Sequence, residues 1–212
     1  MEEKLGLSLG METKYTDIYD RDLLVGIPRK LAREQIGLFK DMPFAGGDLW
    51  NCYELSWLSP KGKPEVRIVQ FFIPFDSENI VESKSVKLYL NSYNGTKFID
   101  ENEVITRLKR DLERATNSKI ELSVKSLSQF SSGKLVMFDG VCLDALDIEA
   151  SEYNVNPKLL KLSDDQDIVE EVLYSNLLKS NCLVTNQPDW ASVQIKYQGR
   201  KINHKSLLQY II

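Results

Sequence analysis

Cys182 and Asp189 lie seven positions apart in the stretch LLKSNCLVTNQPDW. A cysteine thiolate attacks electrophilic carbon, and a nearby cation such as Lys179 favours the thiolate form. A carboxyl group that burial keeps protonated acts as a general acid. The pair therefore has the residue types for nucleophilic attack followed by proton donation. A buried structural thiol beside the Pro188 turn is the alternative, and from spacing alone it is the more common one.

The remaining thiols and the single imidazole limit the other chemistries. Cys52 and Cys142 lie in apolar, strand-like runs, so we expect both in the core. Three cysteines without a framework spacing favour free thiols in a reducing cytoplasm. His204 is the one histidine and falls in a polar segment, KINHK, where we expect a surface position. A zinc site or a Ser-His-Asp triad is correspondingly disfavoured.

A second candidate is the segment ESKS, which opens a predicted helix. Glu82 falls in the first helical turn, where a carboxylate interacts favourably with the helix dipole, so capping is one interpretation. The functional alternative is that backbone amides, the hydroxyls of Ser83 and Ser85, and Lys84 and Lys87 surround an anionic ligand. The chain has no G-x-G-x-x-G and no P-loop motif, which disfavours a Rossmann dinucleotide site and a P-loop ATPase.

The composition is that of a globular protein with a sizeable core. The chain has 212 residues, of which 42% are hydrophobic and 27% charged. Its net charge of −4 implies no general affinity for nucleic acids or anionic membranes. We find no apolar run long enough to span a bilayer and no secretory signal pattern at the N-terminus.

Hydrophobic periodicity predicts the order strand, strand, helix, helix, strand, strand. The first two strands form an antiparallel hairpin, and the helices begin near Glu82 and Glu101. The last two strands are expected around Ile120–Val124 and Leu135–Leu143. This order indicates an α+β fold in which helices cover one face of an antiparallel sheet.

The second half of the sequence repeats the first at an offset of 124 residues, since 188 − 64 = 124. YELSWLSPKGKPEVRIVQ aligns with SNLLKSNCLVTNQPDWASVQ, and ESKSVKLYL aligns with NHKSLLQYI. Such a repeat predicts two copies of one supersecondary unit. In this alignment Pro64 matches Pro188, Glu65 matches Asp189, and Leu58 stands where Cys182 stands.

The repeat divides the chain into three segments. Residues 1–46 are expected to be an N-terminal arm, residues 47–148 the first module, and residues 149–212 a linker with the first part of the second module. The second copy reaches only the start of its first helix, so we expect a fragment or a partner surface over that helix.

Four stretches carry a resemblance to a known family: YDRDLLVGIPR, GDLWNCYELSWL, ESKSVKLYLNSYNGTKF and LLKSNCLVTNQPDW. Over essentially its whole length the chain resembles the long, two-module NADPH-dependent 7-cyano-7-deazaguanine reductases, the QueF nitrile reductases of queuosine biosynthesis in tRNA modification. The resemblance implies tandem tunnelling-fold (T-fold) modules, a cytoplasmic location and a homodimer. It implies a small deazapurine substrate, with no direct nucleic-acid or membrane partner.

The resemblance also implies roles for individual residues. Cys182 matches the nucleophile that forms a covalent thioimide with the nitrile, and Asp189 matches the residue that protonates the nitrile nitrogen. Substrate contacts match Val81, Glu82 and Ser83, and NADPH contacts match Ser83 and Lys84.

The sequence also departs from the family pattern. The family's His-Glu pair, on the helix that begins near His204, and its Arg-Gly cofactor segment are not found in the 212 residues. Two alternatives therefore stay open. One is a catalytically silent binding or assembly protein with a truncated second module. The other is a T-fold relative such as a zinc-dependent cyclohydrolase, which the single histidine disfavours.

Overall fold

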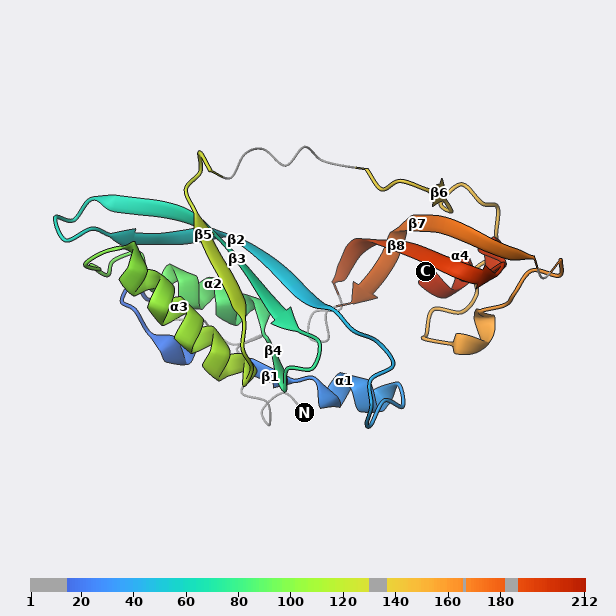
Figure 1. Cartoon of the computed structure of the whole chain (residues 1–212), viewed down its shortest axis with the longest axis horizontal. Helices are drawn as coiled ribbons and strands as arrows, with labels where there is room; N and C mark the ends of the chain where they lie inside the picture. Colours follow the sequence, from blue (N-terminus) through green and yellow to red (C-terminus); the bar gives the residue numbers. More distant parts are fainter. Residues whose placement is uncertain (1–14, 130–136, 166, 182–186) are drawn as a thin grey trace. The chain divides into compact units, whose positions relative to one another are not determined.

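The computed structural model describes residues 15–129, 137–165, 167–181 and 187–212, and it divides the chain into two compact units, Met1–Gly133 and Lys134–Ile212 (Figure 1). Both units combine β-strands, mostly antiparallel, with helices. The α+β class predicted from the sequence is confirmed.

The sheet of unit 1 contains three antiparallel strands in the order β2-β3-β5. β2 (Gly47–Leu58) and β3 (Pro64–Pro74) form the predicted hairpin, and β5 (Glu121–Lys125) pairs with β3. A bulge interrupts the hairpin between Cys52 and Leu55.

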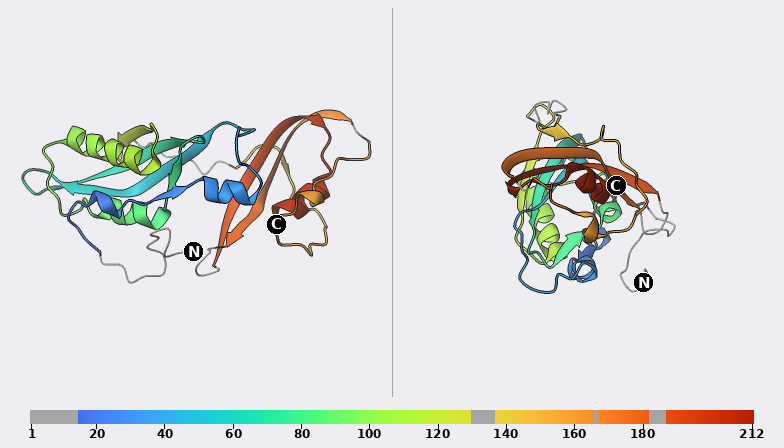
Figure 2. Two further views of the ribbon diagram at one scale, coloured as in Figure 1. Left: turned by 90° about the horizontal axis from the view of Figure 1, so that it is seen from below. Right: turned by 90° about the vertical axis from the view of Figure 1, so that its right-hand side faces the viewer.

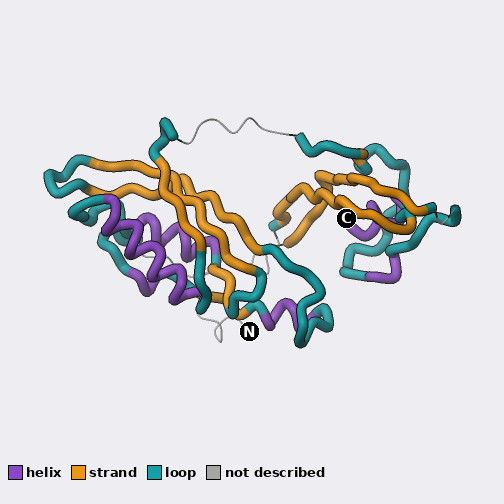
Figure 3. The backbone as a smooth tube through the Cα atoms, in the orientation of Figure 1, coloured by secondary structure: helices purple, strands orange, loops and turns teal. Residues whose placement is uncertain are grey.

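Two helices cover one face of this sheet, as Figure 3 shows. The first is α2 (Ser83–Asn91) and the second is α3 (Glu101–Thr116). Asp100 caps the start of α3, and Asn117 ends it in the left-handed conformation that asparagine tolerates. The apolar stripe of α3 is buried against the strands: Val104, Leu108 and Leu112 pack with Leu55, Phe71 and Ile73.

The described part of the predicted N-terminal arm is built into unit 1. It contains a 3₁₀ helix, η1 (Arg21–Leu23), the short strand β1 (Gly26–Pro28) and the helix α1 (Lys30–Gln35). β1 pairs antiparallel with β4 (Asn79–Val81), which leads directly into α2. The segment therefore supports the start of α2.

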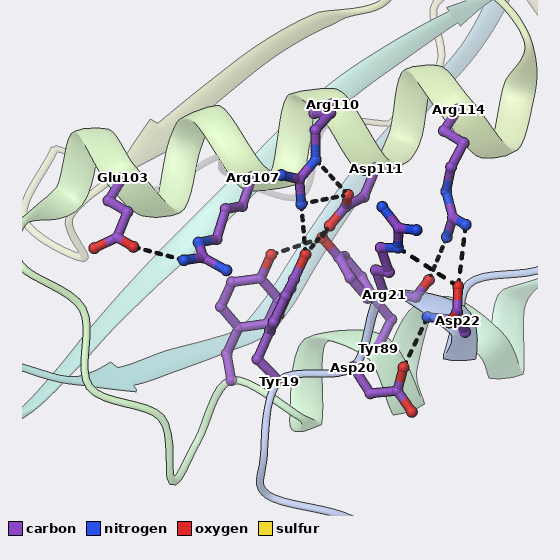
Figure 4. Close-up of polar contacts among 11 residues, drawn as sticks. Tyr19, Asp20, Arg21, Asp22, Tyr89, Glu103, Arg107, Arg110, Asp111 and Arg114 are labelled. Carbon is purple, nitrogen blue, oxygen red and sulfur yellow. Dashed lines mark hydrogen bonds and ion pairs between the residues drawn. The ribbon is translucent and has the colours of Figure 1, made fainter.

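A buried carboxylate anchors the described part of the arm, residues 15–46, to the helices (Figure 4). We call these residues the lead-in segment. Asp111 on α3 is fully buried and accepts hydrogen bonds from Tyr19 (2.5 Å) and Tyr89 (2.8 Å). Arg110 forms an ion pair with the same carboxylate and donates to the Tyr19 hydroxyl. Burial raises the pKa of Tyr89, so its phenol remains a hydrogen-bond donor at neutral pH.

Unit 2 is built from a long hairpin and one longer helix. β7 (Ile168–Asn181) pairs antiparallel with β8 (Pro188–Arg200), and α4 (His204–Ile211) packs on this sheet (Figure 2). A 3₁₀ helix, η2 (Pro157–Leu159), precedes the hairpin. The core consists of Leu143, Leu173, Leu207, Leu208 and Ile211.

The strand expected at Leu135–Leu143 does not complete the first module. The described part of this stretch contains β6 (Val141–Cys142), which pairs parallel with β7 in unit 2. Gly140 explains the docking, because a Cβ there would lie 2.3 Å from the Val172 carbonyl oxygen. Cys142 is consequently exposed, and its expected core position is wrong, whereas Cys52 is buried as expected.

Two features of the described residues bear on function. None of their helices is long and apolar enough to cross a membrane. Within the same residues, no group of three or more His, Cys, Asp or Glu side chains is arranged to hold a metal ion.

Candidate functional site

The start of α2 is organised by Glu82, which is only 4% exposed. Its Oε1 accepts from the backbone amide of Lys84 (2.8 Å), and its Oε2 accepts from the amide of Ser85 (2.6 Å). These are two of the four amides that a helix start leaves without an intrahelical partner. Glu82 is thus the N-cap, and the capping interpretation of the sequence is confirmed.

A backbone clamp from the lead-in segment fixes this cap. The Glu82 amide donates to the Val25 carbonyl (3.0 Å), and the Val25 amide donates to the Ser85 hydroxyl (3.1 Å). The Ser85 hydroxyl in turn donates to the Glu82 carbonyl (2.7 Å). Each donor and acceptor in this ring of hydrogen bonds has a partner, so the Glu82 carboxylate is held in one orientation.

The sequence-predicted neighbours of Glu82 differ in accessibility. Val81 is buried at the end of β4, Ser83 is exposed, and Lys84 is half-buried. An exposed hydroxyl and two lysines, Lys84 and Lys87, thus share the first turns of one helix. This donor set suits a phosphate-bearing ligand, because a helix start and lysines both favour negative charge.

The second candidate site lies on the β7-β8 hairpin of unit 2. Asn181 and Pro188 are the last paired residues of the two strands, and Ser180 pairs with Asp189. Cys182 follows Asn181 directly in the sequence and lies outside the described residues.

Asp189 is exposed on β8. The burial that we expected to keep its carboxyl protonated is therefore not supplied by the described part of its own unit. A bound substrate or another surface would have to exclude water from Asp189 to keep this carboxyl protonated.

The pairing register corrects the alignment of the two hairpins. Leu58 pairs with Pro64 in unit 1, and Asn181 pairs with Pro188 in unit 2. Leu58 is therefore equivalent to Asn181 and not to Cys182. The connection in unit 2 is one residue longer, 182–187 against 59–63, and this insertion escapes an alignment without gaps. Both hairpins carry a bulge three residues before these pairs, at Leu55 and Leu178.

The start of α4 in unit 2 has the same arrangement as the start of α2 in unit 1. Asn203 caps α4 by accepting from the Ser206 amide (3.0 Å). Lys161 takes the place of Val25: its amide donates to the Ser206 hydroxyl (3.1 Å), and its carbonyl accepts from the Asn203 amide (2.9 Å). The region that the sequence predicted as a linker thus contains a second copy of the clamp. Its signal was present in the sequence, because NHKS aligns with ESKS.

The structure also corrects the position of His204. Its side chain is 26% exposed, and its Nε2 lies 3.1 Å from Glu171 on β7. Tyr197 donates to the same carboxylate oxygen (2.7 Å). This phenol lowers the pKa of Glu171, and His204 lowers it further. His204 is thus a half-buried partner of the hairpin, which a polar sequence context did not predict.

Comparison with known proteins identifies the family. Residues 15–124 match the family described as nitrile reductase, 7-cyano-7-deazaguanine-reductase N-term. A relative from Paraburkholderia phymatum is 50% identical over 204 residues, and one from Burkholderia multivorans is 51% identical over 206. Both are named NADPH-dependent 7-cyano-7-deazaguanine reductase. The chain belongs to this family.

The match extends across both units. It covers 96% of this chain and 74% of the length of each relative. The resemblance inferred from the four sequence stretches is thereby confirmed.

Proposed function

We propose that this protein catalyses the NADPH-dependent reduction of 7-cyano-7-deazaguanine to 7-aminomethyl-7-deazaguanine. The observation that carries the proposal is the buried, doubly hydrogen-bonded Glu82 carboxylate at the start of α2, in a chain of a nitrile reductase family. A buried carboxylate in a fixed orientation suits a ligand with several N–H donors.

Cys182 supplies the nucleophile in this proposal. Its thiolate attacks the nitrile carbon, a C–S bond forms, and the nitrile nitrogen takes one proton, giving a neutral thioimide. Asp189 supplies that proton and is returned to the acid form by solvent. Covalent attachment changes a nitrile into a C=N group that is more readily reduced, which divides one difficult step into easier ones.

Glu82 recognises the deazaguanine in this scheme. Each carboxylate oxygen has about two acceptor positions, and the helix cap uses one position on each. The remaining positions accept from the N–H edge of the heterocycle, next to Val81 and Ser83. A ligand without those donors would leave a buried charge poorly paired, so the site selects against it.

Two NADPH molecules, bound in succession, would each supply one hydride; after the first transfer the C–S bond would break and Cys182 would leave as the thiolate, so that the second hydride completes the aminomethyl group, with protons taken from solvent. Ser83 and Lys84 are the residues we assign to NADPH, since the exposed hydroxyl and the lysine lie on the first turn of α2. Their role is to bind and orient phosphate groups. We further propose a homodimer acting in the cytoplasm, because T-fold modules close their barrels by association.

NADPH consumption tests the proposed activity. We expect the purified protein to oxidise two NADPH for each nitrile, with the aminomethyl product detected by mass spectrometry. The matched pair of variants is Cys182→Ala, which removes the nucleophile, and Cys142→Ala, which removes an exposed thiol of unit 2. Equal turnover by both variants would refute the role given to Cys182, and no turnover by the parent would refute the activity and favour a silent binding protein.

A further inference from the structure

Unit 1 contains a groove beside Arg29, at the Pro28–Asn79 end of the β1-β4 ladder, whereas Glu82 follows the Gly26–Val81 end. It has a volume of about 360 Å³ and is lined by Arg29, Arg33, Phe44, Ala45, Gly47, Asp48 and Phe75. Ligand pockets begin at roughly 300 Å³, so the groove has room for one heterocycle with its phosphate. None of these residues has a role in the proposed chemistry.

Arg29 forms one fixed wall of the groove. Its side chain is 13% exposed and forms an ion pair with Asp48 on β2. Its Nε also donates to the Ser77 hydroxyl (2.8 Å), and Ser77 donates onward to the Asn79 carbonyl (2.9 Å). The guanidinium is thus held rigidly while its charge is balanced by Asp48.

Arg33 supplies the charge that is not balanced. Its Nη2 donates to the Phe75 carbonyl, and among the described residues no carboxylate forms an ion pair with it. The guanidinium lies over the Phe44 ring at 5.6 Å, and Phe44 meets Phe75 edge to face at 5.7 Å. A half-buried arginine without a counter-ion, beside an aromatic ring that is 44% exposed, offers both a phosphate contact and a stacking surface.

A second groove adjoins the first and shares Arg29 and Arg33. Its wall adds three carboxylates, those of Glu34, Asp76 and Glu78, and one further cation, Lys30. These carboxylates disfavour an anion on their side of the two arginines. A phosphate is therefore best placed on the side of Phe44.

The β1-β4 ladder connects this groove to the start of α2. Pro28 pairs with Asn79 at the groove end, and Gly26 pairs with Val81 at the end that precedes Glu82. Strands rise about 3.3 Å per residue, so the two ends lie roughly 7 Å apart. One extended ligand can reach from the first turn of α2 to the groove.

We propose that the Arg29-Arg33 groove binds the 2′-phosphoadenosine end of NADPH, with adenine stacked on Phe44 and the 2′-phosphate on Arg33. This inference rests on the proposed function, because it requires NADPH as the reductant. It assigns Arg33 as a specificity-determining residue: NADH lacks the 2′-phosphate and gains nothing from that guanidinium. Arg29 positions the groove wall through Asp48 and Ser77.

Calorimetric titration with adenosine 2′,5′-bisphosphate tests the groove directly. Arg33→Ala removes the guanidinium from a helix in which alanine is well tolerated. A charge-assisted hydrogen bond contributes enough for this variant to weaken bisphosphate binding about tenfold to a hundredfold. Binding of 5′-AMP should stay unchanged. Lys119→Ala is the matched control, since it removes one positive charge from an exposed position of the same unit.

The outcomes separate this inference from the proposed function. If Arg33→Ala binds the bisphosphate as tightly as the parent, or if Lys119→Ala weakens it equally, the groove assignment is wrong. The assignment is also wrong if the parent does not bind the bisphosphate. Thioimide formation with the nitrile alone, followed by near-ultraviolet absorbance, needs no cofactor. Its persistence in Arg33→Ala would show that the chemistry of Cys182 is intact whatever the titration gives.

Discussion

The two units present one scaffold with two different helix starts. In each, a 3₁₀ helix leads to a residue whose backbone clamps the start of a helix, and a bulged hairpin lies beside it. The equivalent pairs are Val25 with Lys161, Ser85 with Ser206, and Glu82 with Asn203.

The differences between the units are few and chemical. Unit 1 has a charged cap that accepts two amides, whereas the cap of unit 2 is a neutral amide that accepts one. Unit 2 has the longer hairpin connection, and that connection contains Cys182 where unit 1 continues with Ser59. The two units thus share one framework, and in the function we propose ligand recognition falls to unit 1 and covalent chemistry to unit 2.

The largest effect that we predict concerns the anchor of unit 1. Asp111→Asn removes a fully buried charge that two phenols and Arg110 depend on. We expect the free energy of unfolding of unit 1 to fall by about 3 kcal/mol. Asp144→Asn in unit 2 is the matched control, because Asp144 is only partly buried and its loss should cost less than about 1 kcal/mol.

Tryptophan fluorescence during denaturant unfolding measures both effects: a Trp190→Phe background leaves Trp50 and Trp57, which report on unit 1, and a background with both of these replaced by Phe leaves Trp190, which reports on unit 2. Equal losses for the two Asp→Asn variants would show that the anchor gives unit 1 no special stability.

A smaller contrast is expected between the two helix caps. Glu82→Ala leaves two amides without their acceptor in a buried setting, and should destabilise unit 1 by about 2 kcal/mol. Asn203→Ala removes one capping bond and should destabilise unit 2 by about 1 kcal/mol. Thermal unfolding of each variant measures the two losses of stability. A larger loss for Asn203→Ala than for Glu82→Ala would contradict the comparison between the caps.

The smallest predicted effect is the pH dependence of the Glu171 cluster in unit 2. Because the folded-state pKa of Glu171 is lowered below its ordinary 4.5, its carboxylate stabilises the fold above that pH. This stabilisation is lost as the pH falls through the folded-state pKa. We expect Glu171→Gln to be up to about 1 kcal/mol less stable than the parent at pH 6, and the difference to vanish under acid conditions. Urea midpoints at several pH values measure it; a difference that grows in acid has the wrong sign.

Local sequence rules predicted the elements that depend on nearby residues. The hairpin of unit 1, both of its longer helices and the cap at Glu82 follow from alternation, apolar periodicity and the helix dipole. The docking of β6 onto β7 was not predictable in this way, because it depends on a long-range close approach at Gly140.

Contacts between distant residues determine the features of the candidate site that could not be predicted from the sequence. The backbone groups of Val25 and Lys161 carry the clamps, and backbone contacts leave little trace in side-chain patterns. The one-residue insertion before Pro188 was visible only from the strand register. The exposure of Asp189 reflects its place at a hairpin end, which periodicity does not report.

In the function we propose, covalent chemistry belongs to Cys182 of unit 2 alone. The direct test is the intact mass and peptide map of the protein after incubation with 7-cyano-7-deazaguanine in the absence of NADPH. We predict one adduct with the full mass of the nitrile, located on Cys182 and lost in Cys182→Ala. Adding Ser59→Cys to that variant places a thiol at the equivalent position of unit 1 and should not restore the adduct. An adduct at the introduced thiol of this double variant, at Cys142, or anywhere in Cys182→Ala would contradict the account.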